Sequence, residues 1–299
     1  MIARKVIAVA NQRSGVGATA TVLSIGRALS ERGHRVLMVD LDPQASLTAV
    51  CGVEHTASVS MGEVLGGTLP GKISLREILR EIAPGRGLLL APSDPALAYT
   101  EMGLLSRLGR DLVMQRALDQ VRAQFDVILI DCPPSIGMLT LSALQAADGV
   151  LIPAKPEVND LRALWIFLAS LEKIKQELNT RLDVIGVMIT SFNYRLEHHK
   201  AVLASMRAAG LDMIPGSIWD QVELIRQGPL ESAVYVPGSP EAQAELALSM
   251  EEWLRRGPLR RGRGTKPLMI RPGTASLENV VLDGKDRDDK DREEEVKDD

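Results

Sequence analysis

The chain has 299 residues, 45% of them hydrophobic and 25% charged, which is the composition of a soluble globular protein with a sizeable core. Its apolar runs are only strand-length, so we expect no bilayer-spanning helix, and polar residues follow the N-terminus too soon for a secretory signal. The two cysteines, Cys51 and Cys132, are too few for a disulfide framework and lack metal-ligand spacing, so a reduced, cytoplasmic protein is expected.

The formal net charge of −4 conceals a strong segregation of charge along the chain. Residues 1–254 sum to −5, residues 255–271 carry seven basic side chains and no acid, and residues 272–299 sum to −6. The last part includes the stretch 283–299, with ten acids against five bases. The C-terminal part of the sequence is therefore more informative about partners than the overall charge is.

Strand-length apolar runs alternate with longer amphipathic segments. The runs read as buried strands of a parallel sheet whose two faces are both covered, at residues 5–10, 35–40, 87–91, 127–131, 150–153 and 184–190. Helical periodicity is found at residues 20–32, 111–124, 139–147, 161–178, 198–209 and 241–256. This alternation predicts an α/β fold with one doubly wound, mostly parallel sheet and helices on both faces.

The composition changes after Gly257. Gly, Pro, Arg and Thr dominate to residue 274, Val280–Leu282 forms a short apolar patch, and the remainder is mostly charged. Such a segment buries too little apolar surface to offset the entropy lost on ordering. We therefore predict one domain, residues 1–256, followed by a disordered tail, residues 257–299, that is basic and then acidic.

The first predicted strand runs into a glycine-containing loop that opens a helix, with the sequence Asn11-Gln12-Arg13-Ser14-Gly15-Val16-Gly17-Ala18-Thr19-Ala20. Unpaired backbone N–H groups and the helix dipole make such a junction an anion site. A phosphate-binding loop normally carries Lys at position 18, before a Ser or Thr that binds Mg²⁺. Thr19 is present but residue 18 is alanine, so spacing alone leaves a ligand-free glycine turn as an alternative.

Two later strands end in carboxylates. One ends in Asp40-Leu41-Asp42-Pro43-Gln44 and another in Asp131-Cys132-Pro133-Pro134. Such residues lie in the crevice where open α/β sheets bind ligands, and there one carboxylate holds a Mg²⁺-bound water while another orients the attacking water in phosphoryl transfer. A single strand-terminal Asp is often only a turn former. The loop and both carboxylate motifs, in this order, favour a nucleotide site.

At these residues the sequence resembles the ParA/MinD/Soj family of deviant Walker A P-loop ATPases, and specifically its ParA/Soj branch. Residues 13–19 (RSGVGAT) look like the family loop KGGVGKT, residues 39–44 (VDLDPQ) match VDxDPQ, and residues 125–135 (FDVILIDCPPS) match the Walker B motif. The similarity runs from about residue 4 to about residue 250. It implies a P-loop NTPase fold with ATP and Mg²⁺ as cofactors.

The resemblance also implies roles for individual residues. Asp42 positions the hydrolytic water, Thr19 binds Mg²⁺, and Asp131 and Asp40 support the metal. The nucleotide would be held by Arg13, Ser14, Gly15, Val16, Gly17, Ala18, Thr19 and Ala20. ATP-bound subunits would form a sandwich homodimer that binds DNA nonspecifically, in association with the nucleoid, until a ParB-like or other partner protein stimulates hydrolysis.

Two residues depart from the family pattern. The phosphate-binding lysine is Ala18 here, and the signature lysine, which reaches across the dimer toward the reacting phosphates, is Arg13. Arginine keeps the charge in a different geometry. A charged hydrogen bond contributes roughly 1.5–3 kcal/mol, so we expect Ala18 to weaken nucleotide binding about tenfold to a hundredfold and to slow hydrolysis. Lys155, at the end of a later strand, is either a substitute charge or a surface lysine.

The leading interpretation is an ATP-dependent partition or positioning protein for a chromosome, plasmid or other cargo. One alternative is a non-enzymatic pseudo-ATPase that serves as a scaffold or regulator. A MinD-like membrane-positioned ATPase is disfavoured, since residues 257–299 offer no amphipathic helix.

The basic segment after the last predicted helix either binds DNA phosphates or is only a solvated linker. In the first case we expect the acidic stretch 283–299 to compete with DNA for it. The candidate DNA-binding residues are Arg255, Arg256, Arg260, Arg261, Arg263 and Lys266.

Other residues carry weaker signals. His198 and His199 have no third ligand at suitable spacing and are expected at an exposed helix start. Met102, Met114 and Met138 are expected to fill the core.

Overall fold

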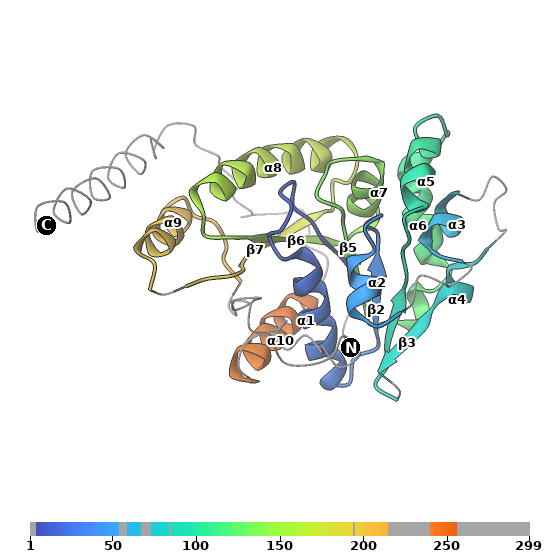
Figure 1. Ribbon diagram of the computed structural model, residues 1–299, viewed down its shortest axis with the longest axis horizontal. Helices are drawn as coiled ribbons and strands as arrows, with labels where there is room; N and C mark the ends of the chain where they lie inside the picture. The colour runs from blue at the N-terminus through green and yellow to red at the C-terminus, as the bar shows by residue number, and fades with distance from the viewer. Residues whose placement is uncertain are drawn as a thin grey trace, which may run out of the picture.

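The computed structural model describes residues 4–53, 59–66, 73–83, 85–193, 195–214 and 240–255. Its strands are β1 (Lys5–Val9), β2 (Val36–Asp40), β3 (Arg80–Ala83), β4 (Leu88–Ala91), β5 (Val127–Asp131), β6 (Gly149–Ala154) and β7 (Asp183–Ile189). They form one sheet in the order β3-β4-β2-β5-β1-β6-β7 (Figure 1). Neighbouring strands are parallel except β3 and β4. The predicted doubly wound, mostly parallel sheet is confirmed, and β3 is an antiparallel edge strand that the sequence did not reveal.

Helices cover both faces of this sheet. One face is covered by α1 (Ala18–Glu31), α2 (Ser46–Val50) and α10 (Pro240–Arg255). The other is covered by α3 (Met61–Gly66), α4 (Leu75–Ile78), α5 (Leu97–Leu104), α6 (Val113–Asp119), α7 (Met138–Ala146), α8 (Val158–Glu177) and α9 (Glu197–Ala208) (Figure 1). None of the described helices is long and apolar enough to cross a membrane.

Most long helices begin and end within about three residues of their predicted limits, but the helix predicted at 111–124 is broken. It consists of a 3₁₀ turn (Arg110–Leu112), α6, and a second 3₁₀ turn (Arg122–Gln124). The short helices α2 to α5 were not predicted, because they are too short to show helical periodicity.

The strands are buried on both faces. Ile7 and Val9 face the layer of α1 and α10, whereas Val6 and Ala8 face the opposite layer, and all four are fully buried. This double burial is the reason why the strand sequences do not alternate between apolar and polar residues. Met114 and Met138 are buried as predicted, but the prediction for Met102 is wrong, since its side chain is 69% exposed.

Helix α10 is fixed to the sheet at its C-terminal end. The Trp253 indole N–H donates to Asp183 at 2.9 Å, and the Lys5 ammonium lies 4.4 Å from the Trp253 ring centroid. A Cβ atom on Gly149 would lie only 2.5 Å from the Trp253 ring, so a glycine is needed there. The helical layer that begins with α1 is therefore completed by a helix about 200 residues later in the chain.

A buried carboxylate ties α10 to α1. Glu251 accepts hydrogen bonds from Arg32 at 2.6 and 3.1 Å, and lies 3.0 Å from the His34 imidazole and 3.1 Å from Arg255. The hydrogen bond from Arg32 is the main reason why the pKa of Glu251 is lowered to about 2. The predicted boundary at residue 256 and the predicted tail, residues 257–299, lie outside the described residues.

We predict that Glu251→Gln lowers the free energy of unfolding by about 2 kcal/mol at pH 7, because charged hydrogen bonds from Arg32 and Arg255 are lost. Since the pKa of Glu251 is lowered on folding, its contribution is present above pH 4.5 and is lost as the pH falls towards 2. Chemical denaturation at several pH values measures the difference. Glu245→Gln, at an exposed position of the same helix, is the control, and an equal effect of both changes would contradict the assignment.

Candidate functional site

The loop between β1 and α1 has the backbone of an anion-binding turn. Gly15 and Gly17 have φ angles of 72° and 85°, which L side chains rarely adopt. Gly17 is the N-cap of α1, and no side chain caps the first turn of this helix. The N–H groups of that turn are therefore free to bind an anion, with the positive end of the helix dipole behind them.

Two side-chain hydrogen bonds tie this loop to the ends of β6 and β7. The Asn11 amide donates to the Pro153 carbonyl at 2.7 Å, and its oxygen accepts the Arg13 N–H at 3.1 Å. The Thr190 hydroxyl, at the end of β7, donates to the Val16 carbonyl at 2.7 Å and is buried. Sequence reasoning missed Thr190, because nothing near residue 190 marks a partner 174 residues away in the chain.

Asp40 and Asp131 lie side by side at the carboxyl ends of β2 and β5. The two residues pair directly in the strand register, and both side chains are buried. Asp40 accepts hydrogen bonds from the Thr48 N–H and hydroxyl, at 2.8 and 2.7 Å, and from the Asp42 N–H at 3.1 Å. Because β5 lies between β2 and β1, the carboxylate pair is adjacent to the loop that follows β1.

Ionisation of both carboxylates of this pair is unfavourable in the absence of a cation. Burial is the main cause that raises the pKa of Asp40 to about 6, and the charge of Asp42 adds to it. Burial likewise raises the pKa of Asp131 well above the usual range, and the charges of Asp40 and Asp42 raise it further. Two buried like charges are stable together only if a proton or a positive ion lies between or beside them.

The residues at this edge fit Mg²⁺. One carboxylate oxygen of Asp131, Oδ2, is buried and has no hydrogen-bond partner among the described residues. The Thr19 side chain, from the first turn of α1, hydrogen-bonds to Asp131 and partly counters the rise of its pKa. A hydroxyl and carboxylate oxygens are the hard ligands that Mg²⁺ prefers.

Asp42 lies in the loop after β2. Its side chain is half-buried, and its Oδ1 accepts the Gln44 N–H at 2.9 Å. The Asp42 carbonyl accepts the Ser93 hydroxyl at 2.8 Å, so the backbone of this loop is held while the carboxylate remains accessible to solvent. This is the position expected of a group that orients a water molecule at the edge of the site.

Arg13 forms an ion pair within its own chain. Its Nε lies 2.7 Å from Oδ1 of Asp160, near the start of α8, but without the alignment of a hydrogen bond. The Asp160 side chain is 7% exposed, whereas that of Arg13 is 52% exposed. Asp160 was not predicted as a site residue. Arg13 is therefore held on its own subunit in this conformation.

The loop has little positive charge for a phosphate. Ala18 lies in the first turn of α1, partly buried against the core of that layer, and contributes no charge. Arg13 is paired with Asp160, and Lys155 is half-buried without an ion pair among the described residues. Against these two cations stand the carboxylates of Asp40, Asp42 and Asp131.

His198 and His199 have a carboxylate neighbour that sequence spacing did not reveal. Glu157, in the loop before α8, lies 3.0 Å from the His199 Nε2 and 3.4 Å from the His198 Nε2. The prediction of an exposed helix start is correct for His198 but wrong for His199, which is 4% exposed. The Nδ1 of His199 accepts the Asn193 N–H at 3.0 Å, so its Nε2 carries the proton that Glu157 accepts. Both ring nitrogens of His199 are thus used, which favours a hydrogen-bonded contact over a metal site.

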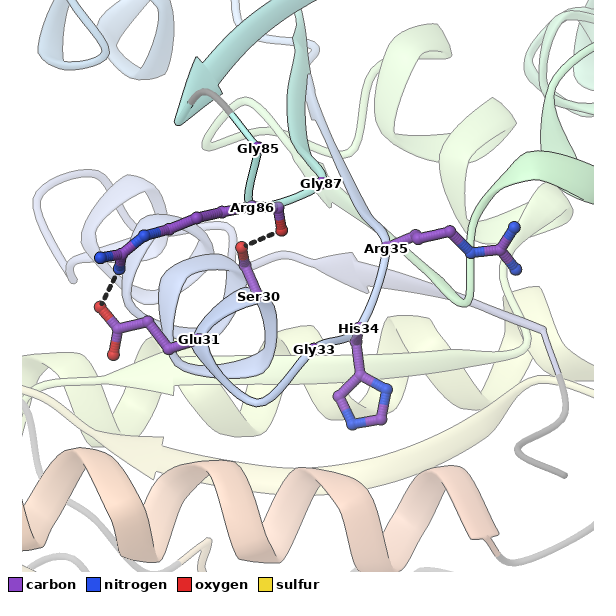
Figure 2. A pocket seen from close by; sticks show the side chains of 8 residues that line it. All are labelled: Ser30, Glu31, Gly33, His34, Arg35, Gly85, Arg86 and Gly87. Carbon is purple, nitrogen blue, oxygen red and sulfur yellow. Dashed lines mark hydrogen bonds and ion pairs between the residues drawn. The ribbon is translucent and has the colours of Figure 1, made fainter.

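A pocket at the amino-terminal ends of the strands is separate from this site, which lies at their carboxyl ends. Its volume is about 490 Å³, and it lies at the start of β2 and β4 (Figure 2). Arg86 pairs with Glu31 at 3.5 Å, and Arg35 pairs with Asp126 at 2.7 Å. Its cationic side chains are thus already paired. The lining residues are Ser30, Glu31, Gly33, His34, Arg35, Gly85, Arg86 and Gly87.

Only one of the predicted DNA-binding residues is described. Arg255 is exposed at the end of α10 and is paired with Glu251. The others lie outside the described residues: Arg256, Arg260, Arg261, Arg263 and Lys266.

Comparison with known proteins identifies the family. A family model described as an AAA domain matches residues 4–184. The sporulation initiation inhibitor protein Soj of Bacillus subtilis is 31% identical over 250 residues, 83% of this chain and 97% of Soj. An uncharacterized protein of Mycobacterium tuberculosis is 37% identical over 201 residues, which is 67% of this chain but only 62% of that relative. The chain thus aligns with less than two thirds of the mycobacterial relative.

A solved structure with the same fold contains a nucleotide. The crystal structure of cobyrinic acid a,c-diamide synthase from Mycobacterium smegmatis, with a bound ATP analog and magnesium, has a TM-score of 0.69 and 35% identity. The match covers 83% of this chain and 95% of that one. The fold is therefore that of a P-loop NTPase.

We predict that Thr190→Val loosens the loop after β1, because the Val16 carbonyl loses its buried donor. Removal of such a bond costs about 1–3 kcal/mol. Hydrogen exchange should accelerate at the amides of residues 12–18 while the centre of the sheet stays protected. Thr190→Ser, which keeps the hydroxyl, is the matched control, and faster exchange in that variant as well would contradict the role.

We predict that Asp131→Asn stabilises the ligand-free chain increasingly as the pH rises above about 4. Since folding raises the pKa of Asp131, the folded chain holds a proton that the unfolded chain has lost, and stability falls as the pH rises through this range. The asparagine avoids that loss. Thermal midpoints in EDTA measure the difference. Asp126→Asn is the control, and its effect on stability should have the opposite sign, because pairing with Arg35 lowers the pKa of Asp126. A pH-independent effect of Asp131→Asn on stability would contradict the account.

Proposed function

Because the chain belongs to the ParA/Soj family of AAA-domain P-loop ATPases, we propose that it is an ATP-dependent partition or positioning protein. In this proposal two ATP-bound subunits form a sandwich dimer on DNA, and Mg²⁺ accompanies the nucleotide. Binding or hydrolysis of the nucleotide is weakened by Ala18.

The observation that supports this proposal most strongly is the buried pair Asp40–Asp131 beside the uncapped helix α1. The orphaned Oδ2 of Asp131 favours a positive partner, and the free N–H groups of α1 favour a negative one. A Mg²⁺-bound triphosphate supplies both at once. Mg²⁺ would be held by Thr19 with Asp131 and Asp40 around it, and when bound it would supply positive charge that stabilises the negative phosphates.

The other residues of the site have separate tasks. The backbone from Gly15 to Ala20 binds the phosphates. Asp42, which is accessible to solvent, accepts a proton from the attacking water and orients it. Arg13 leaves Asp160 and binds the phosphates of the partner subunit's nucleotide, so the ion pair with Asp160 favours the separated subunits.

The alternative function is a pseudo-ATPase that serves as a scaffold or regulator of a partition system. The absence of a lysine at position 18 and the pairing of Arg13 with Asp160 favour it. Equilibrium dialysis with Mg²⁺-ATP separates the two functions. If no binding is measurable at millimolar nucleotide, the ATPase function is excluded and the scaffold function remains.

The proposed partners follow from the family. They are a second copy of the chain, nonspecific DNA, and a ParB-like or other protein that stimulates hydrolysis, and the proposed location is the cytoplasm, at the nucleoid. The proposed site for DNA is the basic segment that begins at Arg255, the last described residue of α10.

We predict that Ala18→Lys raises ATP affinity about tenfold to a hundredfold and increases turnover, because a charged hydrogen bond to phosphate contributes roughly 1.5–3 kcal/mol. Calorimetry and release of phosphate measure the two effects. In this background Asp42→Ala should preserve binding yet abolish turnover. If Ala18→Lys hydrolyses ATP no faster than the unaltered chain, the site has lost more than one lysine and the scaffold function gains support.

We predict that truncation at Gly257 largely removes DNA binding, since residues 255–271 carry seven bases and the preceding 254 residues sum to −5. Binding through phosphate contacts should weaken steeply with salt. Fluorescence anisotropy with a random-sequence duplex at several salt concentrations measures it. Unchanged affinity of the truncated chain at low salt would make the basic segment a linker and place DNA binding on the domain.

A further inference from the structure

The turn that carries Asp42 has a strained backbone. We call residues 42–45 the Asp42 turn. Ala45, at its end, is fully buried and has a φ angle of 52°, in the left-handed region. Residues other than glycine adopt this conformation at a cost, and they keep it only where the surrounding structure holds them in it. The Ala45 N–H donates to the Asp42 carbonyl at 2.9 Å, so contacts from outside the turn have to hold its shape.

Ser93 supplies one of these outside contacts. Its hydroxyl donates to the Asp42 carbonyl at 2.8 Å, which gives that carbonyl a second donor besides the Ala45 N–H. Ser93 follows β4, the neighbour of β2 in the sheet, and is only 2% exposed. Water therefore has little access to this serine, and its hydrogen bond joins the segments that follow two adjacent strands.

The same serine closes a ring of hydrogen bonds. Its N–H donates to the Thr48 hydroxyl at 3.0 Å, and that hydroxyl donates to Oδ2 of Asp40 at 2.7 Å. Oδ1 of Asp40 accepts the Asp42 N–H at 3.1 Å, which completes the ring. We call Asp40, Asp42, Thr48 and Ser93 the Asp42 ring. Within it, Asp42 is held at its N–H by Asp40 and at its carbonyl by Ser93.

Ser93 is itself fixed through the residues on either side of it. The Pro92 carbonyl accepts the N–H of Met61, the first residue of α3, at 2.9 Å. The Asp94 carboxylate accepts the Ala96 N–H at 2.8 Å. A side chain can position a reacting group only if its own place is determined by such contacts. The segment that carries Ser93 meets this condition.

These contacts leave one oxygen of the Asp42 side chain for chemistry. Because the Gln44 N–H donates to Oδ1 at 2.9 Å, rotation of the carboxylate is restricted as well. Oδ2 is then the oxygen left to accept a proton from water. A displacement of a reacting group by about 1 Å can lower a rate about a hundredfold. The place of this oxygen therefore depends on the ring that holds the Asp42 backbone.

We propose that Ser93 is the positioning residue of Asp42, and that it fixes the Asp42 turn through its hydroxyl. Its consequence for hydrolysis rests on the proposed ATPase function, whereas the fixing of the turn does not. The proposal adds the segment after β4 to those after β1, β2 and β5 as a part of the site. Sequence reasoning did not find Ser93, because its partners Thr48 and Asp42 lie 45 and 51 residues away in the chain.

Hydrogen exchange of the full chain without nucleotide tests the fixing of the turn. Amides of the Asp42 turn should exchange several-fold faster in Ser93→Ala than in the unaltered chain. Thr48→Val, which opens the ring at another bond, should act in the same way, and Thr48→Ser should not. Ser30→Ala is the matched control, because the buried Ser30 also donates to a carbonyl at 2.8 Å, that of Arg86, beside the pocket at the amino-terminal strand ends. Unchanged exchange in Ser93→Ala, or equal acceleration at this turn in Ser30→Ala, would overturn the proposal.

Kinetics in the Ala18→Lys chain test the consequence for hydrolysis. There Ser93→Ala should lower kcat about tenfold to a hundredfold, with KM for Mg²⁺-ATP and affinity for Mg²⁺-ADP unchanged. Ser30→Ala should leave all three values unchanged, although both variants should lose a similar amount of thermal stability. An undiminished kcat in Ser93→Ala, an equal loss in Ser30→Ala, or weaker binding of ADP in Ser93→Ala would refute the positioning role.

The two experiments separate this proposal from the proposed function. If the Ala18→Lys chain does not hydrolyse ATP, the ATPase function fails, and the exchange experiment alone decides whether Ser93 fixes the Asp42 turn. Faster exchange of the turn in Ser93→Ala would still support the positioning role, and unchanged exchange would still overturn it.

Discussion

The repulsion between Asp40 and Asp131 is the constraint on which the site depends. Each carboxylate ends a buried strand, and the sheet register places one directly beside the other. Thr48 and the Asp42 N–H satisfy Asp40, whereas Oδ2 of Asp131 has no partner among the described residues. The repulsion is relieved by a proton on the pair or by a bound cation, which displaces that proton. The fold thus holds a strained electrostatic arrangement at the one edge where α1 presents free N–H groups.

Contacts with the rest of the domain hold the loop after β1 and helix α1 in place. Thr190, at the end of β7, and the contact of Asn11 with the end of β6 fix the loop, and α10 packs against α1 through Trp253 and Glu251. Because these contacts join segments far apart in the sequence, the geometry of the loop depends on the completed fold. The ion pair between Arg13 and Asp160 adds a contact within the chain, which the proposed dimer would have to replace.

Features that depend on local sequence patterns could be predicted from the sequence. Continuous apolar runs revealed the buried strands, and the loop and the two aspartate motifs indicated a candidate site, whose residues the fold brings together at the strand ends. It did not reveal β3, which is antiparallel and at the edge, or the partners Thr190, Asp160 and Glu157, whose pairing depends on tertiary contacts. Met102 was assigned to the core on its apolar character alone, but α5 is apolar on both sides, so periodicity could not tell which side is buried.

Proton release on binding of Mg²⁺-ADP tests the central claim most directly. Calorimetry near pH 6 in buffers of different ionisation enthalpy counts the protons, after correction for the nucleotide. Because the pKa of Asp40 is raised to about 6 and that of Asp131 is also raised, a bound cation should displace a proton from the pair. The account predicts net release that diminishes in Asp131→Asn, and no binding in EDTA. Equal binding with and without Mg²⁺, or binding without any release of protons, would contradict it.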